Sequence, residues 1–180
     1  MTQPDIQIRE TTSSDHEDIR FIQKAAFETD EEANLTDELL QDPTAKPLIS
    51  LIALRNDKPA GHILFTKAKI EGYQKSEHVA LLAPLAVLPE YQGEGIGGLL
   101  IKEGLRLLKE QGTEMVFVLG DPDYYRKYGF VPEAGSFGFD PPFPVPERYA
   151  DAWMVQALTL QGLSKSVGKL IPANALNQQK

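Results

Sequence analysis

The chain has 180 residues, of which 42% are hydrophobic and 24% are charged, and it contains no Cys. This length and composition are typical of a soluble globular protein and exclude a disordered or fibrous chain, so we expect a single domain spanning residues 1–180. The net charge of −8 argues against nucleic acid or an anionic membrane as the main partner, and the lack of Cys excludes disulfides, thiolate metal sites and a cysteine nucleophile.

The first part of the chain predicts one strand and then two helices. Residues 6–9 alternate between apolar and polar side chains, as a short strand does, and residues 11–15 offer side chains that cap helices. Ser14 and Glu17 have the spacing of a capping box, which predicts that the first helix begins there. Residues 28–42 hold seven carboxylates and no Lys or Arg, and their leucine spacing predicts a second short helix.

Strands are expected next. Residues 48–54 and 61–70 flank a turn-forming segment and therefore predict a β-hairpin. A further strand, from about residue 78 to residue 87, contains Pro84. Proline cannot donate a hydrogen bond to a sheet, so we expect an edge, a bulge or a separation of two strands at this point. The apolar run that holds this strand is far shorter than the roughly 20 residues of a membrane-spanning helix.

The second half of the chain predicts a strand, a helix and a strand in series. Leucines at helical spacing mark a long helix that Gly112 ends, and residues 115–119 read as a short buried strand. Together with the strand before the helix, this order implies a parallel or mixed sheet. Asp121, Pro122 and Gly129 then stand where a helix cap, a first helical residue and a helix end are expected.

The remaining residues show weaker patterns. Residues 132–146 are rich in Pro, Gly and Phe and predict a loop, whereas residues 152–160 predict a last strand. The first residues lack the basic and apolar regions of a secretory signal, so a cytoplasmic location is expected.

Four glycines lie within six residues, from Gly93 to Gly98, just ahead of the long helix. Each glycine lowers helix stability by about 1 kcal/mol relative to Ala, so the cluster needs a reason beyond forming a turn. Open backbone N–H groups and the positive end of a helix dipole are the features that bind phosphates. The glycines alone fit two interpretations equally well, a pyrophosphate site and a tight loop with close helix packing.

Two phosphate-binding patterns compete for this segment. Gly93, Gly95 and Gly98 match the dinucleotide-binding pattern, and Asp121 stands near the distance expected of its ribose-binding acid. A dinucleotide-binding oxidoreductase remains the second alternative, because its fold requires further strand–helix units that the rest of the chain does not display. A phosphate loop of the nucleotidase kind fails, because Leu99 follows Gly98 where Lys is required.

The stretch Gln-Gly-Glu-Gly-Ile-Gly at residues 92–97 resembles the acetyl-CoA motif of GNAT-superfamily N-acetyltransferases, Gln/Arg-x-x-Gly-x-Gly/Ala. Tyr125 stands four residues before Gly-Phe, which resembles the second conserved block of that family. The segment at residues 120–125 resembles the bacterial YhbS-like branch. The resemblance implies an α/β fold, α+β in some schemes, whose mixed central sheet is flanked by helices and has splayed fourth and fifth strands.

The resemblance also implies a reaction and a site. The reaction is transfer of an acetyl group from acetyl-CoA to a primary amine of a small-molecule or peptide acceptor by direct attack, without a metal. The pantetheine arm would pair with the backbone of Leu85 and Val87 in the gap between the splayed strands. Five residues would meet the pyrophosphate: Gln92, Gly93, Gly95, Gly97 and Gly98.

Tyr125 is the candidate general acid, because it occupies the Tyr position of the family's second block and a phenol can donate a proton. The adjacent Tyr124 is its rival, and Tyr128 is expected to pack in the core. The general base is not identified. Two histidines and several carboxylates are candidates for it: His62, His78, Glu77 and the acids of residues 28–32.

Other interpretations stay open. No grouping of His, Asp and Glu has metal-ligand spacing, and the segment around Ser136 misses the nucleophile elbow of hydrolases. A non-catalytic module that binds acyl-CoA is an alternative to an enzyme. The acidic residues 28–42 fit either an entrance that attracts cationic amines or a solubilising surface. Neither nucleic acid nor a membrane is expected as a partner, whereas a homodimer is kept among the expectations.

Overall fold

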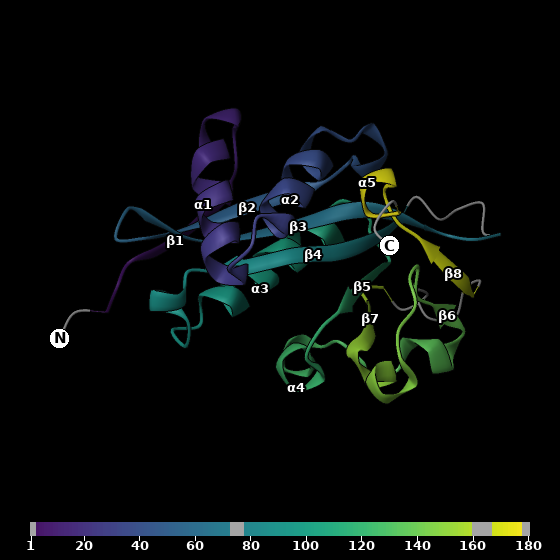
Figure 1. Ribbon diagram of the computed structural model, residues 1–180. Helices are drawn as coiled ribbons and strands as arrows, with labels where there is room; N and C mark the ends of the chain where they lie inside the picture. The colour runs from purple at the N-terminus through teal and green to yellow at the C-terminus, as the bar shows by residue number, and fades with distance from the viewer. Residues whose placement is uncertain (1–2, 73–77, 160–166, 178–180) are drawn as a thin grey trace.

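The computed structural model describes residues 3–72, 78–159 and 167–177 (Figure 1). The strands are β1 Ile6–Glu10, β2 Ile49–Arg55, β3 Lys58–Ile70, β4 Val79–Val87, β5 Met115–Leu119, β6 Phe139–Asp140, β7 Trp153–Ala157 and β8 Gly168–Ile171. The α-helices are α1 His16–Phe27, α2 Glu31–Gln41, α3 Ile96–Glu110, α4 Pro122–Tyr125 and α5 Asn174–Asn177. Among the residues that these ranges cover, no helix is long and apolar enough to cross a membrane.

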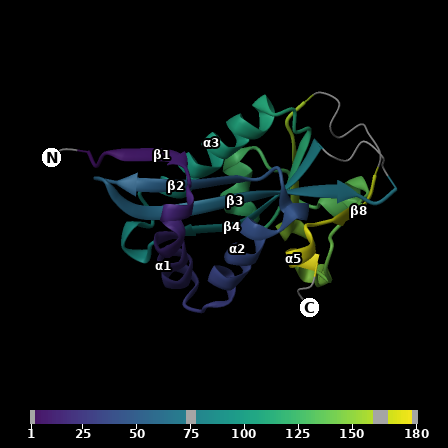
Figure 2. The same ribbon diagram turned by 90° about the horizontal axis from the view of Figure 1, so that it is seen from above.

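The strands form a mixed sheet in the order β1-β2-β3-β4-β5-β7, and β8 extends it by pairing with the far end of β3 and with β6. Every neighbouring pair in that order is antiparallel except β4 and β5, which are parallel and are joined by α3. The expected mixed sheet is confirmed, and Figure 2 shows β1 to β4 side by side. A Rossmann fold needs several consecutive parallel units, so the dinucleotide-binding alternative is wrong.

Helices cover both faces of the sheet. Alternate residues of each strand point to opposite sides, so both faces present apolar side chains that a helix can bury. Ile52 of β2 packs with Ile22 of α1, whereas its neighbours Leu51 and Ala53 belong to the cluster that includes Leu100 of α3. In Figure 1, α1 and α2 stand above the strands. The predicted β2–β3 hairpin packs against helices on both of its faces and therefore forms the centre of the core.

The first helix begins differently from the prediction. Thr12 and Asp15, not Ser14 and Glu17, form the capping box, and they cap a short 3-10 turn that leads into α1. Asp15 is buried, and its carboxylate accepts two hydrogen bonds of 2.8 Å from Arg9 and one from the Thr12 N–H. The Arg9 guanidinium lowers the pKa of Asp15 to about 2.

The prediction at Pro84 is confirmed in two respects. The register of β3 and β4 shifts between Ile63 and Phe65, where two residues of β4 oppose one residue of β3, as in a β-bulge. The pairing of β4 with β5 ends at Leu82, which lies opposite Val118. The second half of β4 therefore has no strand partner on the β5 side, and the two strands splay apart beyond this point.

The C-terminal part of the chain departs most from the expectations. The strand predicted for residues 152–160 ends at Ala157, residue 160 lies outside the described residues, and a further strand and helix follow, so that strand is not the last one. The expected loop of residues 132–146 includes a 3-10 turn and the two-residue strand β6. A strand of two residues is too short to show an alternating pattern, so hydropathy could not reveal it.

Close packing between α3 and β3 leads to a prediction about stability. A Cβ atom at Gly104 of α3 would overlap the ring of Phe65, which is fully buried on β3. Ala favours a helix by about 1 kcal/mol over Gly, whereas overpacking a core costs about 1–3 kcal/mol. We expect Gly104→Ala to destabilise the protein by about 1 kcal/mol, which should appear as a lower midpoint of denaturant unfolding.

The matched control for this variant is Gly135→Ala. A Cβ atom at Gly135 meets nothing within 4 Å, and its backbone does not have the positive φ that excludes Ala. We expect this variant to change stability by less than about 0.5 kcal/mol. A Gly104→Ala protein as stable as the wild type would show that the helix can move away from the sheet at no cost.

Candidate active site

A cavity of about 490 Å³ lies where β4 separates from β5, between the free edge of β4 and the short helix α4. Three parts of the chain far apart in the sequence build its wall: the end of β4, the glycine-rich turn before α3, and the segment from α4 to residue 128. The residues on the wall are Leu85, Val87, Tyr91, Gln92, Gly93, Gly95, Ile96, Gly97, Tyr124, Lys127 and Tyr128. The structure thus brings together most of the residues that the sequence predicted for one site.

The glycine-rich turn has a backbone that favours glycine at two positions. Gly93 and Gly95 both have φ of +86°, a conformation that other residues adopt at a cost, and no atom lies within 4 Å of an added Cβ at either. Gly95 is the N-cap of α3, so the first N–H groups of this 15-residue helix have no partner within the helix. Free N–H groups and the positive helix end face open space, which suits a phosphate group.

The next two glycines serve close packing instead. A Cβ atom at Gly97 would overlap the Tyr124 hydroxyl, and one at Gly98 would overlap the Tyr128 ring. The close-packing interpretation of the glycine cluster thus holds for Gly97 and Gly98, whereas Gly93 and Gly95 leave the space that the pyrophosphate interpretation requires. Gly98 was expected to meet the pyrophosphate, but it is not on the cavity wall, because Tyr128 covers it.

The free edge of β4 forms the second side of the cavity. The Leu88 N–H donates to the Ala60 carbonyl of β3 at 2.8 Å. Polar groups of successive residues point to opposite sides of a strand, so those of Leu85 and Val87 point away from β3, toward the cavity. We expected all of them to be free, but the Val87 carbonyl accepts a hydrogen bond from Gln92 Nε2 at 3.1 Å. Gln92 thus anchors the turn to β4 through its side chain.

The third side is made of tyrosines, and here the structure places Tyr124 rather than the leading candidate on the cavity wall. Tyr124 lines the cavity, whereas Tyr125 does not, because its ring lies against Gly120 and makes an edge-to-face contact with Phe130. Adjacent residues of a helix point in different directions, so only one of the two can face the turn. Tyr128 packs against the core, as expected, and also borders the cavity one turn after Tyr124.

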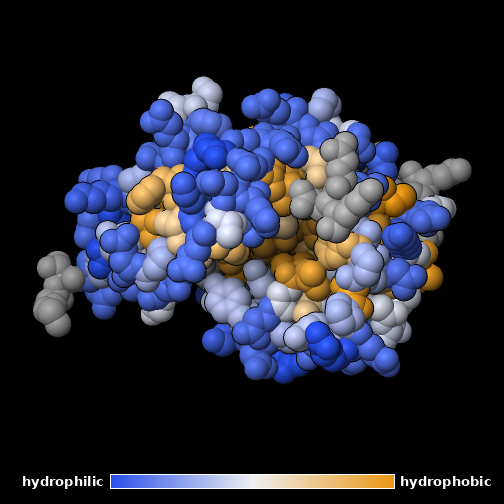
Figure 3. Space-filling model, viewed as in Figure 1, coloured by the Kyte–Doolittle hydropathy of each residue, from blue (hydrophilic) through white to orange (hydrophobic). Residues whose placement is uncertain are grey.

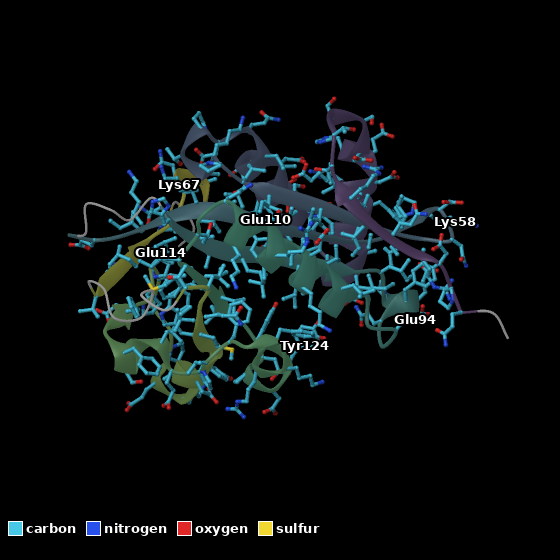
Figure 4. The ribbon with its side chains drawn as sticks, turned by 180° about the vertical axis from the view of Figure 1, so that it is seen from behind. Lys58, Lys67, Glu94, Glu110, Glu114 and Tyr124 are labelled. Carbon is cyan, nitrogen blue, oxygen red and sulfur yellow. The ribbon has the colours of Figure 1, made fainter. Side chains whose placement is uncertain are left out.

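The surroundings of Tyr124 keep its hydroxyl protonated. Burial raises the pKa of Tyr124 to about 12, and a hydrogen bond to Tyr128 adds to the effect. Figure 4 labels Tyr124 on the side of the molecule where α4 lies. A phenol in this state can donate a proton near the first turn of α3 but does not act as a base at neutral pH. Burial also raises the pKa of Tyr125, which is packed away from the cavity.

None of the candidate bases that the structure describes lies on the cavity wall. His62 is buried between Gln23 Nε2, 3.0 Å from its Nδ1, and Ser50 Oγ, 2.8 Å from its Nε2. Burial lowers the pKa of His62 to about 3, so this imidazole stays neutral and serves as a packed core residue. His78 precedes β4 at the end opposite to Val87, and Glu77 lies outside the described residues.

Several carboxylates of the acidic segment, residues 28–42, have partners within the protein. Asp37 pairs with Arg20, and Asp30 lies 3.4 Å from Lys24 Nζ. Asp42 accepts hydrogen bonds from the backbone of Thr44 and Ala175. Asp30 and Asp37 thus join α1 to α2, and Asp42 joins the end of α2 to α5, which favours a structural role for these three carboxylates.

A second hollow, of about 670 Å³, lies between the start of α1 and the end of α2. Two of its polar residues bind each other, since the Thr11 hydroxyl donates to Ser50 Oγ at 2.7 Å and Ser50 contacts the buried His62.

In the described ranges, no group of three or more His, Asp or Glu residues could hold a metal ion. Figure 3 shows the face seen in Figure 1, where apolar residues gather in a central hollow below α1 and α2.

Comparison with known proteins agrees with this geometry. Residues 10–130 match the model of the acetyltransferase (GNAT) family. The Escherichia coli K12 protein named uncharacterized N-acetyltransferase YjhQ is 46% identical over 154 residues, which are 86% of this chain and 85% of that protein. The E. coli N-acetyltransferase YhbS is 34% identical over 108 residues, 59% of this chain and 62% of that protein.

Two solved structures are similar over nearly the whole chain. The crystal structure of E. coli YhbS in complex with CoA has a TM-score of 0.87 and 26% identity, covering 100% of this chain and 96% of that one. The structure of a Brucella melitensis GNAT-family acetyltransferase in complex with acetyl-CoA has a TM-score of 0.75 and 29% identity, covering 96% and 98%.

Proposed function

The chain belongs to the acetyltransferase (GNAT) family and is an N-acetyltransferase, and from that premise we propose that it transfers an acetyl group from acetyl-CoA to a primary amine by direct attack. The acceptor is proposed to be a small molecule or a peptide. One observation supports this proposal above the others: the glycine turn, the free edge of β4 and the Tyr124 hydroxyl border the same cavity. The turn would bind the pyrophosphate, the edge of β4 would bind the pantetheine arm, and Tyr124 would give a proton to the departing thiolate.

The residues of the cavity fit acetyl-CoA. The turn at Gly93 and Gly95 is open, and the first N–H groups of α3 are free to bind the pyrophosphate. The unpaired backbone groups of Leu85 can bind the extended amide chain of pantetheine, as another strand would. CoA and acetyl-CoA are also the ligands named for the two similar structures.

The proposed acetyl transfer uses one proton donor on the protein, Tyr124. The amine nitrogen forms a bond to the acetyl carbon and loses a proton to solvent or to a base that is not assigned. The carbon–sulfur bond breaks, and Tyr124 gives its proton to the departing thiolate, then regains one from solvent. A thiol has a pKa of about 8.5 and Tyr124 one of about 12, so this transfer is uphill and is completed when the tyrosinate regains a proton from solvent. The Tyr124 hydroxyl therefore assists departure of the thiolate and is not indispensable to it.

A panel of amines tests the proposal directly. Purified protein is mixed with acetyl-CoA and a polyamine, an aminoglycoside, single amino acids or short peptides, and the release of free thiol is followed. We expect at least one amine to release thiol above the blank without acceptor, and mass spectrometry to find an acetyl group on its nitrogen. CoA binding with no thiol release for any amine would favour a non-catalytic acyl-CoA-binding module, and acetylation of oxygen or sulfur would overturn the amine proposal.

A further inference from the structure

An ion pair joins the glycine-rich turn to the central hairpin. Arg55, the last residue of β2, donates from Nε to Glu94 Oε1 at 2.7 Å, and its guanidinium carbon lies 4.6 Å from the centre of the Tyr91 ring. Glu94 stands between Gly93 and Gly95, and Tyr91 is on the cavity wall. In Figure 4, Glu94 lies at the same end of the molecule as Lys58, the first residue of β3.

The turn is packed at its two ends, where Ile96 is buried and Tyr91 lies against the core, but its middle has few side-chain contacts. Gly93 and Gly95 have open space where a side chain would be, so neither has a side chain that fixes the turn. The Gln92 side chain ties one end of the turn to β4 through the Val87 carbonyl. The ion pair of Arg55 and Glu94 ties the middle of the turn to β2, which lies two strands away from the free edge of β4.

Charge gives a second reason for the pair. A carboxylate inside a phosphate-binding turn repels the ligand unless a cation neutralises it. The Glu94 and Arg55 side chains are only 32% and 26% exposed, and Arg55 is held over an aromatic ring, so the two charges stay together better than a freely exposed pair does.

We propose that Arg55 is a positioning residue for acetyl-CoA: by binding Glu94 and stacking on Tyr91, it holds the glycine turn in the conformation that receives the pyrophosphate. This inference rests on the proposed function, because it assumes that CoA binds at the turn. The pair acts before the reacting atoms meet, so its loss changes affinity for CoA and not the rate of acetyl transfer at saturation.

The test is a double-mutant cycle with Arg55→Ala, Glu94→Ala and the double variant, in which the Kd of CoA, the KM of acetyl-CoA and kcat are measured. We expect each single variant to raise Kd and KM about three- to tenfold, the range of one partly exposed ion pair with an aromatic contact, and to leave kcat within about twofold. The double variant should be no weaker than the weaker single variant. Glu94→Gln, which keeps a hydrogen-bond acceptor for Arg55, should recover most of the affinity.

The matched control is Arg106→Ala, which removes another Arg that pairs with glutamates, Glu103 and Glu110 on the exposed side of α3. It should leave Kd unchanged. Additive effects in the double variant, tighter binding by Glu94→Ala, or a fall in kcat equal to the rise in KM would overturn the inference. If Arg55→Ala does not fold, Arg55→Gln replaces it in the cycle. A wild-type protein that binds no CoA would instead contradict the proposed function itself.

Discussion

Replacing Gly95 with Glu is expected to weaken CoA binding by about 100-fold or more while the protein stays folded. The new carboxylate would project into the open space at the N-terminus of α3, where the proposed pyrophosphate lies. At an effective dielectric constant of about 20, two like charges about 4 Å apart repel by about 4 kcal/mol, and each 1.4 kcal/mol is a factor of ten in affinity. Isothermal titration calorimetry with CoA measures the effect.

The control for this variant must carry the same backbone strain without the same location. Gly72 follows β3 at the end away from the glycine turn, its φ is +82°, and no atom lies within 4 Å of an added Cβ. Gly72→Glu therefore imposes a similar conformational cost and adds the same charge, but far from the cavity. We expect it to bind CoA like the wild type. Equal affinities of Gly95→Glu and wild type would show that CoA does not use this turn.

The parts of the site that the sequence predicted correctly are those set by local rules. Glycines before a helix produced an open turn because they permit positive φ, and Pro84 marked the bulge because it cannot join a sheet ladder. Both effects depend on the residue itself and its immediate neighbours. The same holds for Asp121, whose side chain accepts a hydrogen bond from the Asp123 N–H at 3.0 Å and caps α4 as predicted.

The features of the site that could not be predicted from the sequence depend on how distant elements pack. Arg55 and Glu94 are 39 residues apart, and no periodicity connects them. His62 looked like a candidate base because of its ordinary pKa, but α1 covers it and removes its charge. Tyr124 and Tyr125 occupy one helical turn, and its rotation relative to β5 decides which ring enters the cavity. A helix of one turn has too few residues for an apolar face to reveal that rotation.

That rotation leads to the second large expected effect: Tyr124→Phe should lower kcat while leaving the Kd of CoA nearly unchanged. The substitution removes only the hydroxyl, which is the proton donor in the proposed reaction, and keeps the ring that packs over Gly97. Loss of a general acid typically costs about 10²- to 10⁴-fold in rate, and the low end is expected because a thiolate leaves readily. Steady-state kinetics with the amine found by the acceptor panel measure kcat.

Tyr125→Phe is the matched control, because it removes the same atom from the adjacent residue, whose ring lies against Gly120 and Phe130 outside the cavity. We expect its kcat to stay within about threefold of the wild type. The pH profile gives an independent readout: with its pKa raised to about 12, Tyr124 stays protonated through the alkaline range, so wild-type kcat should show no decline from this group below about pH 11. An unchanged kcat in Tyr124→Phe together with a large fall in Tyr125→Phe would return the role of general acid to Tyr125, and would require α4 to turn when acetyl-CoA binds.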